Sequence, residues 1–491
     1  MLDRKTLYAA VKNNDARLDG KFFVGVRTTG IYCRPVCKAR TPKEENCTFF
    51  ATAAEAEGAG FRPCLLCRPE LAPGVAPVDA AAALAHRAAR RMEEGREGEE
   101  TLAALARALG VSDRHLRRAF EAEYHVSPVQ YRQTCRLLLA KRLLTDTDLP
   151  VTEVALAAGF QSLRRFNALF QSCYRMAPNE LRKRRKALAE TAGQVTLELR
   201  YRPPYRWEAL LAFLEQRAIP GVEKVEEGAY LRTVGLKSGE SLHTGWLKVA
   251  HVPEREALSV TVSASLLPVL PQVLSRVRHL FDLYCEPETI YEALKGMNEL
   301  HPDLCRPGTR LPGCFDPFEM SVRAVLGQQI TVKGATTLAG RMARALGTPV
   351  ETGVEGLDRL FPTTGELLAL SGPLAEHLGP LGVISARSRT IEGLARVMEE
   401  GTVDFDCPAQ PREEAEKLLA LPGVGPWTAQ YVAMRTMGWA DAFPGTDLGI
   451  VKALAPRTKK EIETLSETWR PWRAYAAINL WNWESGREKA E

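Results

Sequence analysis

The chain has 491 residues, of which 45% are apolar, 25% charged and 7% aromatic. This composition excludes a wholly disordered or collagen-like chain, and the length suggests about three domains. No uninterrupted apolar run of about 18 residues occurs, which excludes a membrane-spanning helix. Because Met1–Lys5 leads into no apolar signal core, we expect a cytoplasmic protein. In that compartment, the 11 cysteines indicate metal or thiol chemistry rather than disulfides.

The charge is distributed unevenly along the chain. The net charge is +5, but residues 101–186 hold 16 Lys and Arg against 7 Asp and Glu, whereas residues 194–491 hold 33 against 38. A basic block followed by a mildly acidic one indicates separate modules, and the basic module is suited to a polyanion. On charge alone, a basic face that contacts only solvent explains the same counts.

The N-terminal part is rich in loops, and the apolar run 22–26 predicts a strand. It contains two cysteine pairs: Cys33 and Cys37 are separated by three residues, and Cys64 and Cys67 by two. Each short loop lets two thiolates converge on one ion, so the pattern predicts one tetrahedral zinc ion with these four ligands. Four unrelated core residues are the alternative.

These pairs lie in segments 28–37 (TTGIYCRPVC) and 60–67 (GFRPCLLC), which resemble the N-terminal domain of the Ada adaptive-response proteins. The resemblance implies that Cys33 irreversibly accepts a methyl group from a methylphosphotriester in DNA. Zinc keeps the thiol deprotonated and nucleophilic. With four thiolates the centre has a formal charge of −2, which repels anionic phosphodiesters but not a neutral triester. Methylation weakens that repulsion, so repair would also act as a binding switch. A purely structural zinc site is the alternative.

A helical repeat follows the cysteine segment. Residues 79–92 are strong helix formers, and the glycines at 95 and 98 end that run. Two copies of one helical unit come next, offset by 49 or 50 residues. The repeated residues are Ala106 and Ala155, Gly110 and Gly159, Phe120 and Phe170, Tyr124 and Tyr174, and Pro128 and Pro178.

Each copy has the pattern of a helix-turn-helix, with a glycine at the turn and a serine that can cap an arginine-bearing second helix. Together the copies resemble the paired helix-turn-helix domain of AraC-type regulators, which implies two recognition helices in adjacent major grooves. A generic helical bundle is the alternative, and the sequence does not tell which bases are read. The arginines expected to contact DNA are Arg114, Arg117, Arg118, Arg164 and Arg165.

The C-terminal part begins as mixed α/β and ends as helices. Alternating patterns predict strands over 196–201 and 258–263, with an apolar stretch at 207–217 and a helical pattern at 270–283. Helical periodicity dominates from about residue 316 almost to the end.

A helix-hairpin-helix signature, LPGVGPWTA, occupies residues 421–429. Gly423 and Gly425 let the hairpin backbone approach a phosphate, whose oxygens accept N–H groups from the turn and from the next helix. Asp447 follows Gly425 by 22 residues, in a loop with Gly and Pro. This is the layout of a DNA glycosylase superfamily.

The flanking segments resemble the AlkA-type alkyladenine glycosylases, namely residues 201–207, 311–319, 325–329 and 469–476. The resemblance implies that Asp447 is the catalytic carboxylate, and Asp441 is the competing acid. Gln329 takes the position of the wedge that fills the emptied base stack, where a leucine is expected. The aromatic positions implied around the base pocket are Phe213, Trp427, Tyr431 and Trp481.

The position two residues after Gly425 decides the reaction type. Bifunctional relatives have a Schiff-base lysine there, but this chain has Trp427, so we expect a monofunctional glycosylase with water as the acceptor. The target base must be flipped out of the duplex. An alkylated purine such as 3-methyladenine is cationic, so electron-rich rings attract it, and a carboxylate stabilises the developing oxocarbenium sugar. No Cys-His pair occurs, so the second methyltransferase common in Ada proteins is not predicted.

We therefore expect a multidomain, mainly α protein that recognises double-stranded DNA, both alkylated DNA and promoter DNA. RNA polymerase is the partner expected of a transcriptional activator. The alternative is a transcriptional regulator whose glycosylase-like domain is inactive. The expected parts are a small zinc-bound α/β domain (1–75), an all-α double helix-turn-helix domain (79–186), a basic linker (187–194), an α+β domain (195–305) and an all-α helix-hairpin-helix domain (306–491).

Overall fold

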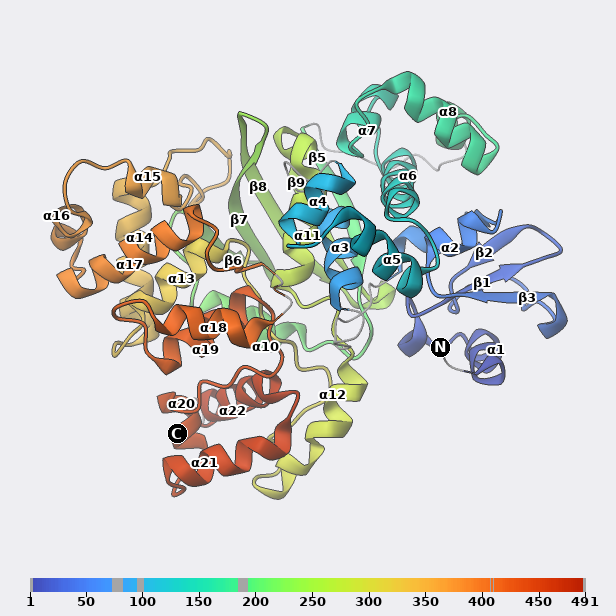
Figure 1. The fold of residues 1–491 in the computed structure, drawn as a ribbon. Helices are drawn as coiled ribbons and strands as arrows, with labels where there is room; N and C mark the ends of the chain where they lie inside the picture. Colours follow the sequence, from blue (N-terminus) through green and yellow to red (C-terminus); the bar gives the residue numbers. More distant parts are fainter. Residues whose placement is uncertain are drawn as a thin grey trace.

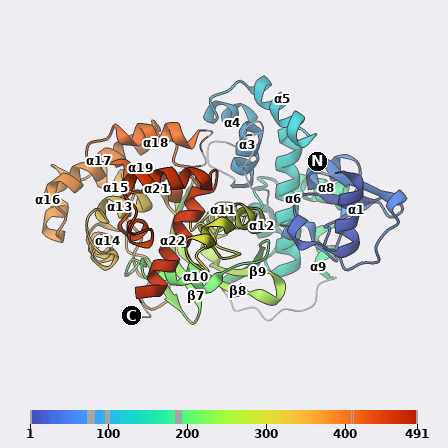
Figure 2. The same ribbon diagram turned by 90° about the horizontal axis from the view of Figure 1, so that it is seen from below.

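The computed structural model describes residues 3–72, 83–94, 101–183, 193–406, 408 and 410–488. The molecule is multidomain and mainly α-helical, as predicted (Figure 1). A small sheet domain lies at one side, the helix-turn-helix units lie next to it, and the C-terminal half forms the other side; Figure 2 shows the same division from below. In the described part of the chain, no helix combines the length and the apolar character needed to cross a membrane.

The N-terminal domain is a four-stranded sheet with two helices. Its elements are α1 (Arg4–Asn13), β1 (Phe23–Val26), β2 (Ile31–Cys33), β3 (Cys47–Phe50), α2 (Ala53–Gly58) and β4 (Arg62–Pro63). The strand order is β3-β1-β2-β4, in which β4 pairs in parallel with β2. Leu7 and Val11 of α1 pack with Phe22 in the core on one side of this sheet. The short strands and the parallel pairing place the segments after β2 and after β4 next to each other.

Helices α3 to α9 form the helix-turn-helix module. They are α3 (Ala83–Glu94), α4 (Leu102–Ala108), α5 (Asp113–Tyr124), α6 (Pro128–Asp146), α7 (Val151–Ala157), α8 (Leu163–Tyr174) and α9 (Pro178–Lys183). The first part of the predicted helix, residues 79–82, lies outside the described residues. The predicted linker at 187–194 also lies outside them, apart from Gly193 and Gln194, where the next sheet begins.

The internal repeat is confirmed as two similar helix-turn-helix units. Gly110 and Gly159 occupy the two turns with φ of +70° and +80°, a conformation in which a residue with a Cβ is strained. Ser112 and Ser162 cap α5 and α8, each accepting a hydrogen bond from the backbone N–H three residues further on. The long helix α6 connects the two units.

The next part of the chain forms a five-stranded antiparallel sheet in the order β5-β9-β8-β7-β6. Its elements are β5 (Gln194–Arg200), α10 (Trp207–Glu215), β6 (Glu223–Glu226), β7 (Ala229–Ser238), β8 (Ser241–Val252), β9 (Ala257–Ser263) and α11 (Leu270–Leu280). Strands β5 and β9 and both helices match the predicted patterns, whereas β6, β7 and β8 were not predicted. Strand β8 carries polar residues through much of its length, which obscures the alternation that marks a strand.

The C-terminal helices enclose two hydrophobic cores. They are α12 (Pro287–Leu294), α13 (Pro317–Leu326), α14 (Val332–Leu346), α15 (Thr364–Leu368), α16 (Leu374–Leu378), α17 (Ser385–Glu399), α18 (Pro411–Leu419), α19 (Pro426–Thr436), α20 (Leu448–Ala453), α21 (Lys459–Ser466) and α22 (Arg473–Glu488). Ile290 and Leu294 of α12 pack in one core with Ile450 and Ile478. A core thus extends across the predicted boundary at residue 305, and that boundary stays a prediction.

A buried carboxyl group joins the sheet domain to helix α6. Glu57 accepts hydrogen bonds from the hydroxyl groups of Tyr32 and Thr134, both at 3.0 Å. Burial raises the pKa of Glu57 to about 7 despite these two bonds and the nearby charge of Lys141, and the charge of Glu70 raises it slightly further. The carboxyl therefore prefers to be protonated in the folded protein over a pH range in which it is ionised in the unfolded chain.

We predict that this carboxyl makes stability depend on pH. Its contribution to the free energy of unfolding is largest below about pH 4.5, the pKa of this carboxyl in the unfolded chain. The contribution is lost as the pH rises to about 7, its pKa in the folded protein. Glu57→Gln removes the cost of ionisation, so it should raise the free energy of unfolding by up to ~3 kcal/mol at pH 8 and by almost nothing at pH 4.5. Denaturant unfolding of the zinc-loaded chain at both pH values measures this. Glu45→Gln, at an exposed site, is the control, and an equal effect at both pH values would contradict the prediction.

Candidate functional site

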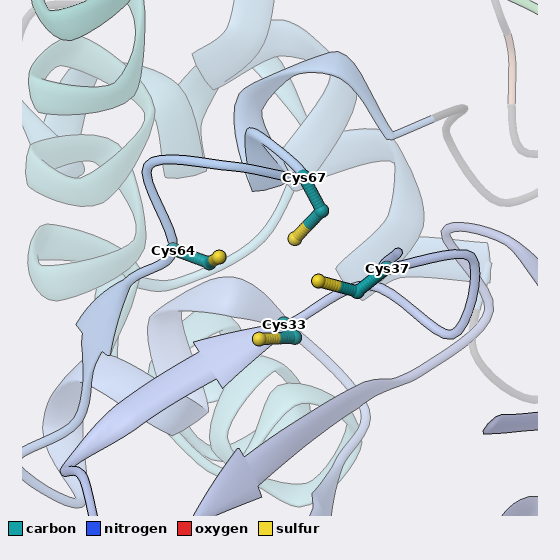
Figure 3. A group of neighbouring side chains, drawn as sticks. All are labelled: Cys33, Cys37, Cys64 and Cys67. Carbon is teal, nitrogen blue, oxygen red and sulfur yellow. The ribbon is translucent and has the colours of Figure 1, made fainter. Parts of the chain in front are cut away.

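The four predicted cysteines come together (Figure 3). Cys33 ends β2 and Cys37 lies in the turn after it, while Cys64 and Cys67 flank the turn after β4. Their sulfur atoms all lie within 4.8 Å of one another. Zinc–sulfur bonds of about 2.3 Å in a tetrahedron place thiolates about 3.8 Å apart, so the donor set and its spacing fit one zinc ion.

A buried arginine holds the two cysteine loops together. The Arg34 side chain is 2% exposed, pairs with Asp19 and donates a hydrogen bond to the carbonyl oxygen of Cys67 at 3.1 Å. The backbone N–H of Arg34 also donates to the Cys67 sulfur at 3.4 Å. Hydrogen bonds among the crowded thiols lower the pKa of Cys37 to about 7 and raise that of Cys33. A cation at the centre is what allows all four thiols to be thiolates together.

The five predicted arginines of the helix-turn-helix units are exposed on α5 and α8. On α5, Arg117 forms an exposed ion pair with Asp113 at 3.2 Å, and Arg118 contacts His115 at 3.4 Å. Such exposed pairs contribute little to stability, so these side chains remain available to phosphates.

The second site is built around Asp447, which caps α20. Its Oδ1 accepts hydrogen bonds from the backbone N–H groups of Gly449 and Ile450 at 2.9 and 3.4 Å. The same oxygen accepts the indole N–H of Trp481 at 2.8 Å, and Oδ2 accepts that of Trp427 at 2.9 Å. All four partners are donors, which matches the acceptor-only character of an ionised carboxylate.

The four predicted aromatic residues lie together beside this carboxylate. Trp427 and Tyr431 stack with ring centres 5.1 Å apart at 10°, and Phe213 stacks on Trp481 at 6.4 Å and 22°. Tyr431 also contacts Trp481, with ring centres 6.1 Å apart. Residues from α10, α19 and α22 thus form one aromatic cluster next to Asp447.

Two arginines of this cluster were missed by the sequence analysis. Arg435 donates to the hydroxyl of Tyr431 at 2.7 Å and to the carbonyl oxygen of Gly313 at 3.0 Å, while the guanidinium of Arg217 lies 3.7 Å from the ring centre of Phe213. Burial alone would raise the pKa of Tyr431, but the charges of these arginines and of Arg323 outweigh it and lower the pKa. Arg435 follows Tyr431 by four residues on α19, and that helical spacing was an available signal.

The hairpin lies between α18 and α19, and Gly423 occupies its turn with φ of +86°. A Cβ at this position would lie 2.0 Å from the Thr390 hydroxyl oxygen, so both the conformation and the space require glycine. The Gln328 side chain donates to the carbonyl oxygen of Gly423 at 2.9 Å and to the Thr428 hydroxyl at 3.0 Å. Gln328 therefore fixes the hairpin to the loop after α13, a role that sequence analysis did not assign.

Two further predicted residues lie near this site in different environments. Gln329 is exposed and has φ of +55°, next to Gln328, and its role as a wedge stays a prediction. Asp441, the competing acid, pairs with Arg470 and with Arg473, the latter at 2.7 Å. These two ion pairs occupy the carboxylate of Asp441.

Family models match three parts of the chain. The AlkA N-terminal domain matches residues 196–316, the metal-binding domain of Ada matches 6–70, and a helix-turn-helix domain matches 105–184. A probable bifunctional transcriptional activator/DNA repair enzyme AlkA of Mycobacterium tuberculosis is 37% identical over 488 residues, which cover 98% of this chain and 96% of the relative. The chain belongs to this AlkA family.

Two relatives match separate halves of this AlkA-family chain. DNA-3-methyladenine glycosylase 2 of Escherichia coli is 35% identical over 283 residues, which cover 58% of this chain and 95% of the relative. The bifunctional transcriptional activator/DNA repair enzyme Ada of the same organism is 40% identical over 153 residues, which cover 31% of this chain and 42% of that relative. The predicted fusion of Ada-type and AlkA-type parts is thus confirmed, and so is the zinc site.

We predict that Gly423→Ala weakens binding to duplex DNA by about tenfold or more, because the clash with Thr390 displaces a turn that donates to phosphate. Fluorescence anisotropy at fixed salt measures the affinity. Gly393→Ala, on the same helix as Thr390 but facing open space, is the matched control and should bind normally. Normal binding by Gly423→Ala would contradict the role of the hairpin.

Proposed function

We propose that this protein repairs alkylated DNA in two ways and regulates transcription in response. Its C-terminal half is a monofunctional glycosylase that releases alkylated bases such as 3-methyladenine, and its N-terminal domain accepts methyl groups from DNA methylphosphotriesters. The observation that carries the proposal is the Asp447 carboxylate, held by two indole N–H groups inside an aromatic cluster beside a DNA-binding hairpin.

In the glycosylase reaction, Asp447 stabilises the positive charge that develops on the sugar as the bond to the base breaks. The two indoles and the helix N-terminus fix the carboxylate before the reaction, so little reorganisation is needed in the transition state. The rings of Tyr431 and Trp481 attract a flipped, cationic purine by cation–π interaction. The electron pair of the breaking bond passes to the cationic base, which leaves as a neutral molecule. A water molecule then attacks the sugar carbon and releases a proton to solvent. No lyase step is proposed, because Trp427 takes the place of an amine nucleophile.

In the methyl transfer, we propose Cys33 as the acceptor. Cys67 accepts a hydrogen bond from the backbone N–H of Arg34 at 3.4 Å, and such a bond stabilises a thiolate and reduces its reactivity. Cys33 holds the position that, by the resemblance of segment 28–37 to the Ada proteins, accepts the methyl group. Its sulfur would attack the methyl carbon, the methyl–oxygen bond would break, and the phosphate would leave as an ordinary phosphodiester anion.

For regulation, we propose that the helix-turn-helix units bind promoter DNA through the exposed arginines of α5 and α8. RNA polymerase is the proposed partner in activation, and the cytoplasm is the proposed location. The domain limits 1–75, 79–186, 195–305 and 306–491 are proposed with them. We further propose that DNA affinity rises after methyl transfer, because the zinc centre then carries one negative charge fewer beside a basic module.

We predict about one zinc per chain and transfer of the methyl group to Cys33. Metal analysis of the purified protein gives the zinc content, and peptide mass mapping after exposure to methylphosphotriester DNA locates the methyl group. Cys47→Ala, which changes a cysteine outside the cluster, is the control and should transfer normally. Methyl on Cys64 would contradict the assignment of the acceptor, and a metal-free chain would contradict the methyl-acceptor proposal.

We predict that Asp447→Asn lowers release of 3-methyladenine by a hundredfold or more, because it removes the charge but keeps the size. Damaged duplex should still bind, since the hairpin is unchanged, although the amide nitrogen of Asn donates and cannot accept the indole N–H that Oδ2 of Asp447 accepts. Asp441→Asn is the matched control and should leave base release nearly unchanged, although its ion pairs with Arg470 and Arg473 weaken. Single-turnover assays of released base measure both variants.

Two results would contradict this mechanism. Normal excision by Asp447→Asn would remove the carboxylate from the reaction, and efficient trapping of the parent on DNA by a Schiff-base reductant would show a lyase step. Absence of excision by the parent chain would instead favour the alternative of a regulator with an inactive glycosylase-like domain.

A further inference from the structure

Helix α6 contacts the zinc-binding domain through residues next to the zinc ligands. Tyr32, which precedes Cys33, donates to Glu57, and Glu57 accepts a second bond from Thr134 of α6. On the other side of the cluster, Cys67 is followed by the segment 68–70, which contacts the last turns of α6. Both cysteine loops are thus connected to one helix by short paths.

The second contact is a buried ion pair. Lys141 of α6 and Glu70 lie 2.5 Å apart, and each side chain is 2% exposed. Arg68 extends the contact by pairing with Glu70 at 3.1 Å and with Asp146 at 2.6 Å. Burial alone would raise the pKa of Glu70, but the charges of Lys141 and Arg68 outweigh it and lower the pKa, which keeps the pair ionised. Breaking such a pair leaves an uncompensated buried charge.

The same helix holds the DNA-binding units in place. Helix α6 packs against α3 and α5 on the side of the first unit and against α7 and α9 on the side of the second. Figure 1 shows α6 between the unit that carries α5 and the unit that carries α8, with the small sheet domain beside them. A displacement of α6 therefore changes the spacing of the two recognition helices, which must match adjacent major grooves.

We propose that α6 is the docking site of the methyl-acceptor domain, and that the Lys141–Glu70 pair couples the state of the zinc cluster to both helix-turn-helix units. The coupling rests on the proposed methyl acceptance at Cys33, whereas the docking does not. Glu70 follows the zinc ligand Cys67 by three residues. A rearrangement of the cluster would therefore displace α6 through the chain and the buried ion pair rather than through solvent.

Hydrogen exchange of the full chain tests the docking without methylated DNA. Removal of zinc with a chelator should increase the exchange of α6 amides between residues 141 and 146, while α17 in the C-terminal half keeps its protection. In the double variant Glu70→Gln, Lys141→Met, which removes both charges together, chelation should cause no further change in α6. Lys295→Met, at an exposed ion pair, is the control and should behave as the parent. Unchanged exchange of α6 in the chelated parent would overturn the proposal.

DNA affinity then distinguishes coupling through α6 from the direct effect of charge. In the parent, affinity at fixed salt should rise once Cys33 is methylated. In the double variant, the methyl group should still reach Cys33, but only the part of the gain that comes from the lost negative charge should remain. An equal gain in both proteins would mean that charge acts through space, and no gain in the methylated parent would mean that nothing is coupled; either result overturns the coupling. If Cys33 of the parent accepts no methyl group from the DNA, both the methyl-acceptor function and the coupling are overturned. The docking of the zinc-binding domain on α6 is then still tested by hydrogen exchange.

Discussion

The carboxylate of Asp447 connects the three helices on which the glycosylase site depends. It caps α20, accepts the indole N–H of Trp427 from α19, and accepts that of Trp481 from α22. The hairpin that is proposed to approach the DNA backbone leads directly into α19, so the same bonds that fix the carboxylate would also fix its position relative to the DNA. The N–H edges of the two indoles orient the acid, while their rings stack with Tyr431 and Phe213 in the aromatic cluster.

The parts of this site that are local in sequence could be predicted, and the parts created by folding could not. The glycines of the hairpin and the distance to Asp447 identify a glycosylase layout, since turn geometry and helix capping depend on neighbouring residues. The indole bonds join residues 20 and 34 positions apart, and no periodicity encodes them. Arg217 illustrates the same limit, because it reaches the cluster from the turn after α10, whereas Tyr431 lies on α19.

The same distinction between local and long-range features applies to the fold. The helix-turn-helix repeat could be predicted because glycine turns, serine caps and buried aromatic residues recur at nearly constant spacing. Strands β6 to β8 could not be predicted. Polar residues interrupt the alternating pattern along β8, and its pairing depends on residues that are distant in the sequence. The contacts of α6 with the zinc-binding domain belong to this second class, since Lys141 and Glu70 are charged residues that a sequence pattern assigns to the surface.

Under the proposed function, the two chemical sites would distinguish damaged from normal DNA by charge, in opposite ways. Undamaged DNA presents anionic phosphates and neutral bases. Methylation of a phosphate removes its charge, which allows it to approach a zinc–thiolate centre that repels its neighbours. Alkylation of a purine adds positive charge, which suits the faces of the aromatic cluster and the nearby carboxylate of Asp447. Each site would therefore use an anionic centre. The zinc–thiolate centre would admit a phosphate that has lost its negative charge, and the Asp447 carboxylate would attract a base that has gained a positive charge. Arg435 donates to the carbonyl oxygens of Pro312 and Gly313 and to the Tyr431 hydroxyl, and its guanidinium lies 5.1 and 5.5 Å from the ring centres of Phe213 and Tyr431. Because Arg217 also lies over Phe213, two cations already border the cluster, and the negative charge that favours a cationic base is that of Asp447.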